Sequence, residues 1–421
     1  MGLKNLKINA DQIFSFERDF IEDSYNKFCS SYQYQSYDSA IPFILDLDKL
    51  VAGGVPDKFS IDVFGCHGVE INKPGYSNKF SVAEAVRQSK SNMVVTLGDN
   101  VYPVGLGPID SDNQKNLLDL EEAGFLQDSA GYLSRGKPHF MSLGNHDYNV
   151  HHGVNQIRHN SPSFFRGARQ ISATYKSRFF NMFPVHMPYR FYALVKTLPN
   201  NSAVIIYCID SNTLLWDAYQ QDWLVKTYQA LNQKFRNHVW NIVAQHNPVF
   251  SRGKRGDPSS FSYDDIGMYE GLLRVHGVEP RRLKTISMAS ELSDYYYNLE
   301  LQDGLKFDAF LGAHDHHTSI VKVAYPTAIN KGDKLLIVAG AGGGKLQSFY
   351  PISNQHLNWE NFRSLYDNDK EYGFCKMTFS YNAGQGQSAL AVMPIGSDGT
   401  ERRSDPIVLV KNVEGVAQLV P

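Results

Sequence analysis

Gly144-Asn-His-Asp147 follows directly on a short apolar run, His139 to Leu143, and this pairing of an apolar run with a polar end recurs along the chain. Further runs of the same kind end in Gly65-Cys-His-Gly68, Gly98-Asp-Asn100, Gln245-His246, Gly312-Ala-His-Asp-His316 and Gly340-Ala-Gly-Gly343. Apolar runs of this length, bounded by glycine, are typical of buried strands. Each run is therefore predicted to be a strand with chemistry-bearing residues at its carboxyl end.

Helical segments are predicted between several of these strands. Ser81-Val-Ala-Glu84 has the spacing of a capping box, which predicts a helix that begins there and runs toward Lys90. The segment from Asp222 to Lys234 carries a helical apolar face, made of Trp223, Leu224, Tyr228 and Leu231. Strands joined by helices predict an α/β layered fold.

The alternation of strands and helices divides the chain into three regions. Residues 1–57 are predicted to form an N-terminal extension or cap, residues 58–400 the main domain, and residues 401–421 a C-terminal tail. Within the main domain, Cys375 to Tyr381 and Ala389 to Ile395 are predicted to be closing strands.

Composition excludes several classes of protein. Apolar residues make up 42% and charged residues 20% of the 421 residues, which is enough to bury a core. A formal net charge of -2 is unlike the basic balance of nucleic-acid-binding proteins, and no apolar stretch approaches the length of a membrane span. Four dispersed cysteines favour a reducing compartment over a disulfide framework. The N-terminal residues lack the apolar core of a signal peptide, so we expect a cytoplasmic protein, or one exported without a cleaved signal peptide.

The polar residues that end the predicted strands are of metal-ligating types. They are Asp99, Asn145, His146, His246, His314 and His316. Oxygen and imidazole donors suit first-row transition metals rather than calcium. Because ligands gather at the carboxyl ends of strands in α/β folds, we expect these side chains to meet. His314 and His316 alternate along an extended segment, which places both rings on one side.

The order of these motifs resembles that of the calcineurin-like metallophosphoesterases. That family carries a first Asp motif, then GDxx, GNH[DE], a His after a strand, and GHxH. The run Gly98-Asp-Asn-Val-Tyr102 is similar to the GDxxY of the small (tartrate-resistant) purple acid phosphatases, whose Tyr binds ferric iron. The matching motifs span residues 65–316. The resemblance implies a layered α/β/β/α sandwich of two mixed sheets flanked by helices.

The resemblance also implies a binuclear metal centre of iron with iron, zinc or manganese. Asp99 would bridge the two ions. The other implied ligands are Tyr102 and His316 for the first metal, and Asn145, His246 and His314 for the second. His146 would serve as general acid or electrostatic stabiliser, and Asp147 would orient His146. Two cations neutralise charge on phosphate oxygens and make a bound water into hydroxide near neutral pH, so no protein nucleophile is needed.

The first motif departs from the family pattern. Where the family has an Asp after the first strand, this chain reads Phe64-Gly-Cys-His-Gly68. One alignment places Cys66 at the Asp position, and another places Gly65 there and keeps His67. A Cys66 thiolate or the His67 ring is therefore a candidate to replace the missing ligand. Ala313 stands where the family has the glycine of GHxH, which predicts a slightly remodelled loop.

Three functions remain open at this stage. The leading hypothesis is an acid-phosphatase-like phosphomonoesterase, a monomer that acts on a phosphorylated small molecule or a phosphoprotein. The same site would serve a phosphodiesterase, because specificity lies in loops such as 103–137 and 148–190. The broken first motif is also compatible with a pseudoenzyme that keeps the fold as a binding module. The basic stretch Ser251-Arg-Gly-Lys-Arg255 lies near the expected site and could attract an anionic phosphoester.

Overall fold

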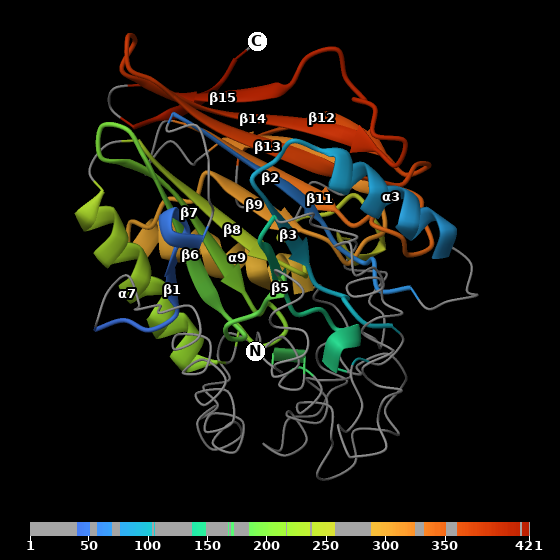
Figure 1. The fold of residues 1–421 in the computed structure, drawn as a ribbon. Helices are drawn as coiled ribbons and strands as arrows, with labels where there is room; N and C mark the ends of the chain where they lie inside the picture. The colour runs from blue at the N-terminus through green and yellow to red at the C-terminus, as the bar shows by residue number, and fades with distance from the viewer. Residues whose placement is uncertain are drawn as a thin grey trace.

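Two eight-stranded sheets form the centre of the computed structural model (Figure 1). The structure describes residues 40–50, 57–69, 76–102, 105, 137–148, 167, 170–171, 185–215, 217–235, 238–256, 288–324, 332–350, 360–412 and 415–420. The predicted specificity loops 103–137 and 148–190 lie mostly outside these residues. Within the described residues, no helix has both the length and the apolar character needed to cross a membrane.

The first sheet has the strand order β16-β15-β14-β13-β2-β3-β4-β5. Its strands are β2 (Lys58–Phe64), β3 (Met93–Leu97), β4 (His139–Ser142), β5 (Val185–His186), β13 (Gly373–Asn382), β14 (Gln387–Gly396), β15 (Ile407–Lys411) and β16 (Ala417–Leu419). The pairs from β2 to β5 are parallel, and the pairs from β2 through β13 to β16 are antiparallel. The parallel strands are the apolar runs of the sequence, because they are buried on both faces.

The second sheet has the order β1-β6-β7-β8-β9-β11-β10-β12. Its strands are β1 (Ile44–Asp46), β6 (Tyr192–Leu198), β7 (Ser202–Ile209), β8 (Val239–Gln245), β9 (Ala309–Gly312), β10 (Thr318–Ala324), β11 (Asp333–Ala339) and β12 (Glu360–Asn368). The central strands β7, β8, β9 and β11 run parallel. In each sheet, the carboxyl ends of the parallel strands therefore lie at the same edge. The ligand-type residues come directly after these strand ends in the sequence.

Helices lie outside the sheets. They are α2 (Leu47–Leu50), α3 (Tyr76–Gln88), α7 (Ala218–Lys234) and α9 (Met288–Gln302), with short 3-10 turns at His146–Tyr148 and Lys254–Gly256. In Figure 1, α3 and α7 lie on opposite sides of the molecule. The predicted layered sandwich of two mixed sheets with flanking helices is confirmed.

One predicted helix start is wrong. Ser81 was expected to cap the helix, but α3 begins at Tyr76 and Ser81 lies inside it. The Ser81 hydroxyl donates to the Ser77 carbonyl one turn earlier. A serine inside a helix bonds in this way instead of capping the first turn. In α7 the structure adds a turn before Asp222, where the Asp217 side chain caps the helix by accepting from the Gln220 amide.

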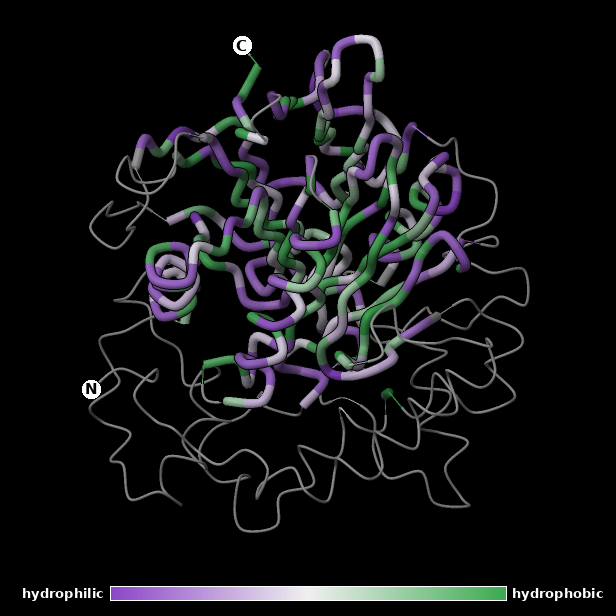
Figure 2. Tube along the Cα trace, turned by 90° about the vertical axis from the view of Figure 1, so that its left-hand side faces the viewer, coloured by the Kyte–Doolittle hydropathy of each residue, from purple (hydrophilic) through white to green (hydrophobic). Residues whose placement is uncertain are grey.

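The core lies between and around the two sheets. In Figure 2 the hydrophobic segments gather among the interior strands. Two buried ion pairs cross this core: Lys411 of β15 with Asp308, and Lys334 of β11 with Glu300 of α9. The Lys411 ammonium lies 4.7 Å from the centre of the Trp240 ring, so it joins β15 of one sheet to β8 of the other.

Both chain ends contribute strands to the sheets. Ile44–Asp46, within the predicted N-terminal extension, pairs in parallel with β6, and the Trp223 indole donates to the Pro42 carbonyl. Residues 407–419, within the predicted C-terminal tail, include β15 and β16 at the edge of the first sheet. The three-region division of the chain stays a prediction.

Candidate metal centre

The site lies where the carboxyl ends of β2, β3 and β4 meet those of β8 and β9. Backbone hydrogen bonds join strand ends between the two sheets, from β2 to β11, and within the second sheet, from β9 to β8. The Gly65 amide donates to the Ala339 carbonyl at 2.8 Å, and the Ala313 amide donates to the His246 carbonyl at 2.8 Å. The strand ends are therefore held at fixed positions before any side chain is considered.

Asn145, His246 and His314 bring three donor atoms together, and we call them the second ligand set. The Nε2 atom of His246 lies 2.9 Å from Asn145 Oδ1 and 3.0 Å from His314 Nδ1. Asn145 and His314 each follow a different strand, β4 and β9. The structure thus brings together all three residues that the sequence predicted for the second metal.

The orientation of the His246 ring favours a cation at this set. His246 Nδ1 lies 2.8 Å from the Leu97 carbonyl, which only accepts hydrogen bonds, so Nδ1 carries the proton. Burial lowers the pKa of His246 although the Asp99 charge opposes this, so the ring is neutral and Nε2 presents a lone pair. This lone pair faces the carbonyl oxygen of Asn145, which is also an acceptor. Two facing acceptors are stabilised by a cation between them.

Tyr102 and His316 form the first ligand set. The Tyr102 hydroxyl lies 3.2 Å from His316 Nε2. His316 Nδ1 lies 2.8 Å from the Lys345 carbonyl, so Nδ1 is again the protonated nitrogen and Nε2 faces inward. Burial lowers the pKa of His316 to about 4, which keeps its Nε2 lone pair free of a proton at neutral pH.

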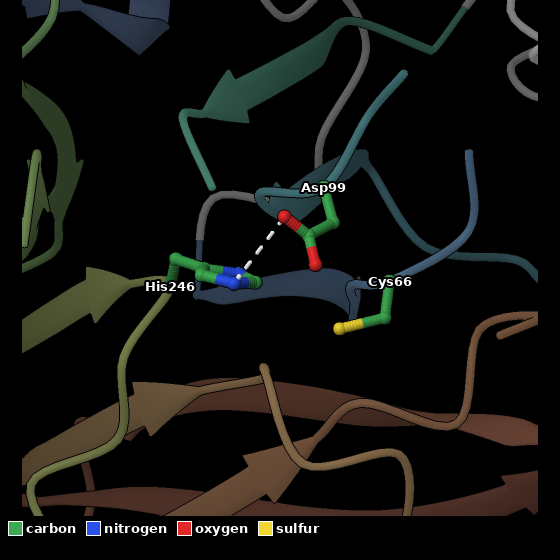
Figure 3. A group of neighbouring side chains, drawn as sticks. All are labelled: Cys66, Asp99 and His246. Atoms are coloured by element: carbon green, nitrogen blue, oxygen red, sulfur yellow. Dashed lines mark ion pairs between the residues drawn. The ribbon is translucent and has the colours of Figure 1, made fainter. Parts of the chain in front are cut away.

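Asp99 lies between the two sets. Its Oδ1 atom is 3.4 Å from His246 Nε2, and its Oδ2 atom accepts a hydrogen bond from the Tyr102 hydroxyl at 2.9 Å. Figure 3 shows the carboxylate between His246 and Cys66. Burial alone would raise the pKa of the Asp99 carboxyl, but the neighbouring rings of His246, His146 and His314 hold it below its usual value. The carboxylate is therefore ionised and faces both sets.

The spacing of these atoms fits transition-metal ions. Two donors that bind one cation at about 2.0–2.1 Å lie about 3.0 Å apart at a right angle and about 3.4 Å apart at the tetrahedral angle. The three distances around His246 Nε2, to Asn145 Oδ1, His314 Nδ1 and Asp99 Oδ1, are 2.9, 3.0 and 3.4 Å. The donor set of the chain thus fits the metal ions that its sequence pattern implies.

His146 and Asp147 lie beside these sets. The His146 ring lies 4.1 Å from the Tyr102 ring, and the His146 amide donates to Asp99 Oδ1 at 3.0 Å. The Asp147 carboxylate accepts hydrogen bonds from backbone amides of both neighbouring loops: Gly144 at 2.7 Å, Asn100 at 2.9 Å and Val101 at 3.0 Å. Burial, reinforced by the Asp99 charge, raises the pKa of Asp147 to about 7. These contacts join the loop that carries Asp99 to the loop that carries Asn145, whereas the role implied by resemblance was to orient His146.

The two candidates for the missing first ligand lie in different surroundings. Donor atoms of Cys66, Asp99 and His246 all lie within 4.8 Å of one another (Figure 3). The His67 ring packs edge-on against Phe64 with centroids 5.2 Å apart. Burial, together with the charges of His139 and Lys79, lowers the pKa of His67 well below its usual value.

The Ala313 departure is matched by Gly65. A Cβ atom on Gly65 would lie 2.6 Å from the Ala313 methyl, so a side chain larger than glycine at residue 65 has no room. The alanine at residue 313 is buried and keeps its backbone bond to His246. The methyl group of Ala313 therefore fits because residue 65, on the adjacent strand end, is a glycine and has no side chain.

Asp315, between the two histidines, holds the basic loop 251–255. Its carboxylate oxygens accept the Arg255 amide at 3.2 and 3.1 Å, and Gly253 packs so closely that a Cβ there would lie 2.4 Å from Asp315 Cγ. These hydrogen bonds hold the Arg255 backbone at Asp315, which lies between His314 and His316 in the chain. Arg252 instead pairs with Asp367 and lies 5.0 Å from the Phe349 ring centre.

Several groups that orient the ligands were missed from the sequence. Two are backbone carbonyls, of Leu97 and Lys345, and no residue type marks such a group. Two are side chains: Asn100, whose amide donates to the Ser142 carbonyl at 2.7 Å, and Gln170, which donates to Asp147 at 2.7 Å. Asn100 follows Asp99 directly, so its place in the Gly98-Asp-Asn100 stretch was the available indication.

Comparison with known proteins matches more than half of the chain to one family. A family model described as calcineurin-like phosphoesterase (Metallophos) matches residues 59–318, more than half of the chain. No curated protein matches the chain. Among solved structures, GAP50, titled the anchor in the inner membrane complex of Plasmodium, is 15% identical with a TM-score of 0.47; the match covers 82% of this chain and 87% of that one. The structure of PhoD is 13% identical with a TM-score of 0.48, and the match covers 88% of this chain and 73% of that one.

Proposed function

The chain belongs to the calcineurin-like phosphoesterase family, and within that family we propose that it is a metal-dependent phosphomonoesterase with a binuclear centre. The proposed ligands are Asp99, Tyr102, Asn145, His246, His314 and His316. Two cations at such a centre, when bound, lower the pKa of a water molecule and neutralise charge on phosphate oxygens. The chain's own residues would hold the cations, orient the ester and supply a proton.

The observation that supports a binuclear centre most strongly is the placement of Asp99. Its two oxygens face two different groups of donors, 3.4 Å from His246 Nε2 on one side and 2.9 Å from the Tyr102 hydroxyl on the other. One ionised carboxylate shared by two groups of neutral donors is the arrangement that two neighbouring cations require. A single ion would be bound by only one of these two groups, and the donors of the other group would have no cation to bind.

Leaving-group protonation is assigned to His146 in this proposal. Its ring lies over Tyr102 at the edge of the centre, and its backbone is held on Asp99. A histidine placed beside the metal ions donates a proton to the departing alkoxide oxygen. Asp147 acts as a positioning residue, because its carboxylate joins the loops of Asp99 and Asn145.

The monoester preference follows from charge. Arg255 belongs to the basic loop 251–255, whose backbone is held by Asp315 between His314 and His316. A phosphomonoester is a dianion near neutral pH and gains more from a guanidinium than a singly charged diester does. We therefore expect a monoester to be the better substrate.

The test compares p-nitrophenyl phosphate with bis(p-nitrophenyl) phosphate as substrates of the metal-reconstituted protein. We expect the monoester to be the better substrate, and His246→Ala and Asn145→Ala to lose at least a hundredfold in kcat/KM together with one bound metal. The matched control is His186→Phe, a buried histidine on β5 that we expect to leave turnover unchanged. Full activity in His246→Ala would overturn the proposal, and a preference for the diester would replace the monoesterase with a phosphodiesterase.

A further inference from the structure

One of the two alignments of the first motif places Cys66 at the family's aspartate position, and the Cys66 backbone limits where its thiol can lie. The residue has a φ of 56°, in the left-handed region that residues other than glycine rarely adopt. Its amide donates to the Gly98 carbonyl at 3.0 Å, and its carbonyl accepts from the Gly344 amide at 2.8 Å. Two neighbouring loops therefore hold the thiol in one direction.

The Cys66 sulfur points into the metal centre. Its Sγ atom, an Asp99 oxygen and a His246 nitrogen lie within 4.8 Å of one another (Figure 3). The His314 amide donates to Sγ at 3.2 Å. The thiol is fully buried. It therefore contacts His314 and lies beside the Asp99 carboxylate that faces both ligand sets.

No other described side chain near the end of β2 takes this place. Asp62, four residues earlier, is held by the hydroxyls of Ser89 and Ser91 and by Lys137. His67 packs edge-on against Phe64, with ring centroids 5.2 Å apart. Of the three residues with a ligand-type side chain at this strand end, only Cys66 is grouped with Asp99 and His246.

We propose that Cys66 binds the first metal as a thiolate and makes this site selective for thiophilic cations such as zinc, a conclusion that rests on the binuclear centre of the proposed function. The cation takes the place of the thiol proton, which leaves to solvent, and a metal–sulfur bond of about 2.3 Å forms. The aspartate of the family pattern would present a hard oxygen, which suits manganese, magnesium and ferric iron. A thiolate shifts the preference toward zinc and cobalt.

The charge of the centre is consistent with this assignment. An ionised Asp99 and a Cys66 thiolate place two negative charges a few ångström apart in a buried site. Such a pair is stable only beside cations.

Cobalt(II) titration of the metal-free, full-length protein tests this proposal, because a thiolate bound to cobalt gives an intense charge-transfer band in the near ultraviolet. We expect two cobalt ions per chain and this band in the parent. Cys66→Ser should lose the band while the second ion stays bound, and Cys66→Asp should bind two ions without the band. The matched control, Cys208→Ser, removes a buried thiol of β7 and should keep the band.

Metal competition gives a second measurement. The ratio of zinc affinity to manganese affinity should fall at least tenfold from the parent to Cys66→Asp. Two cobalt ions without a thiolate band in the parent, or a band that persists in Cys66→Ser, would overturn the role of Cys66 and leave the proposed function standing. A parent that binds no cobalt at all would instead contradict the proposed function itself.

Discussion

Gly65→Ala tests how the two sheets meet beneath the metal centre. The new methyl carbon would lie 2.6 Å from the Ala313 methyl, whereas two carbon atoms in contact prefer about 3.5–4.0 Å. One of the two strand ends must therefore move by about 1 Å. These ends carry Cys66 and His314, so the displacement acts directly on two side chains of the candidate metal centre.

The cost can be worked from the contacts. Inserting one methyl group into a packed site destabilises a protein by about 1–3 kcal/mol. Ala313→Gly alone removes one buried methyl group and adds backbone freedom, which costs about 1 kcal/mol. The double variant no longer contains the clash, because its remaining close neighbours, Cβ and O of Leu97, lie 3.2 Å from the new methyl carbon. We expect the double variant to cost about 1 kcal/mol relative to the parent, and thus a favourable coupling of about 1–3 kcal/mol.

The assay is urea unfolding of the four metal-free proteins of this cycle, followed by cobalt affinity for each. Gly65→Ala should lower both the free energy of unfolding and the cobalt affinity, and Ala313→Gly should restore both in the double variant. If the two penalties simply add, the methyl of Ala313 does not occupy the space above Gly65, and the described junction of the sheets is wrong.

Further predictions concern the core and the substrate. Lys411→Met leaves the Asp308 carboxylate buried without its cation and should cost about 3–5 kcal/mol in urea unfolding, whereas Lys226→Met, at an exposed pair, should change stability by less than about 1 kcal/mol. Burial lowers the pKa of His186 to about 3 from 6.5, so the unfolded chain gains a proton first as the pH falls and folding stability is lost. His186→Phe should therefore lose about 3 kcal/mol less of its free energy of unfolding between pH 6.5 and pH 4 than the parent, and an equal loss would show that this ring is not buried neutral. Arg255→Ala should raise KM for p-nitrophenyl phosphate about tenfold with kcat changed less, and Arg255→Lys should recover part of the effect; an unchanged KM would remove the guanidinium from the substrate site.

The strands that carry the ligand-type residues were predictable, because they are the parallel, fully buried strands. Met93–Leu97 and Val239–Gln245 read as continuous apolar runs since both of their faces are covered. Strands at or next to the sheet edges lack this pattern. The strand Ile407–Lys411 alternates buried and half-buried residues over only five positions, and residues 44–46 span three, which is too short for any period to be recognised.

The positions of the site residues were predictable from their order, but their contacts were not. From the sequence, Cys66 and His67 were equally good candidates for the missing ligand. The direction of each side chain depends on the left-handed backbone at Cys66, which the sequence does not reveal. The contacts of Asp147 with amides of the Asp99 loop depend on the pairing of β3 with β4, which no local pattern specifies. Ligand orientation by the Leu97 carbonyl is a third case, since every residue has that group.

The central claim is that this chain holds two metal ions around Asp99 and uses them to hydrolyse a phosphomonoester. The most direct test is elemental analysis of metal per chain in the purified full-length protein, measured beside turnover of p-nitrophenyl phosphate. We predict two transition-metal ions per chain and turnover that rises in proportion to the occupancy of the second ion as metal is restored. One ion or none after reconstitution, with no turnover, would contradict the claim.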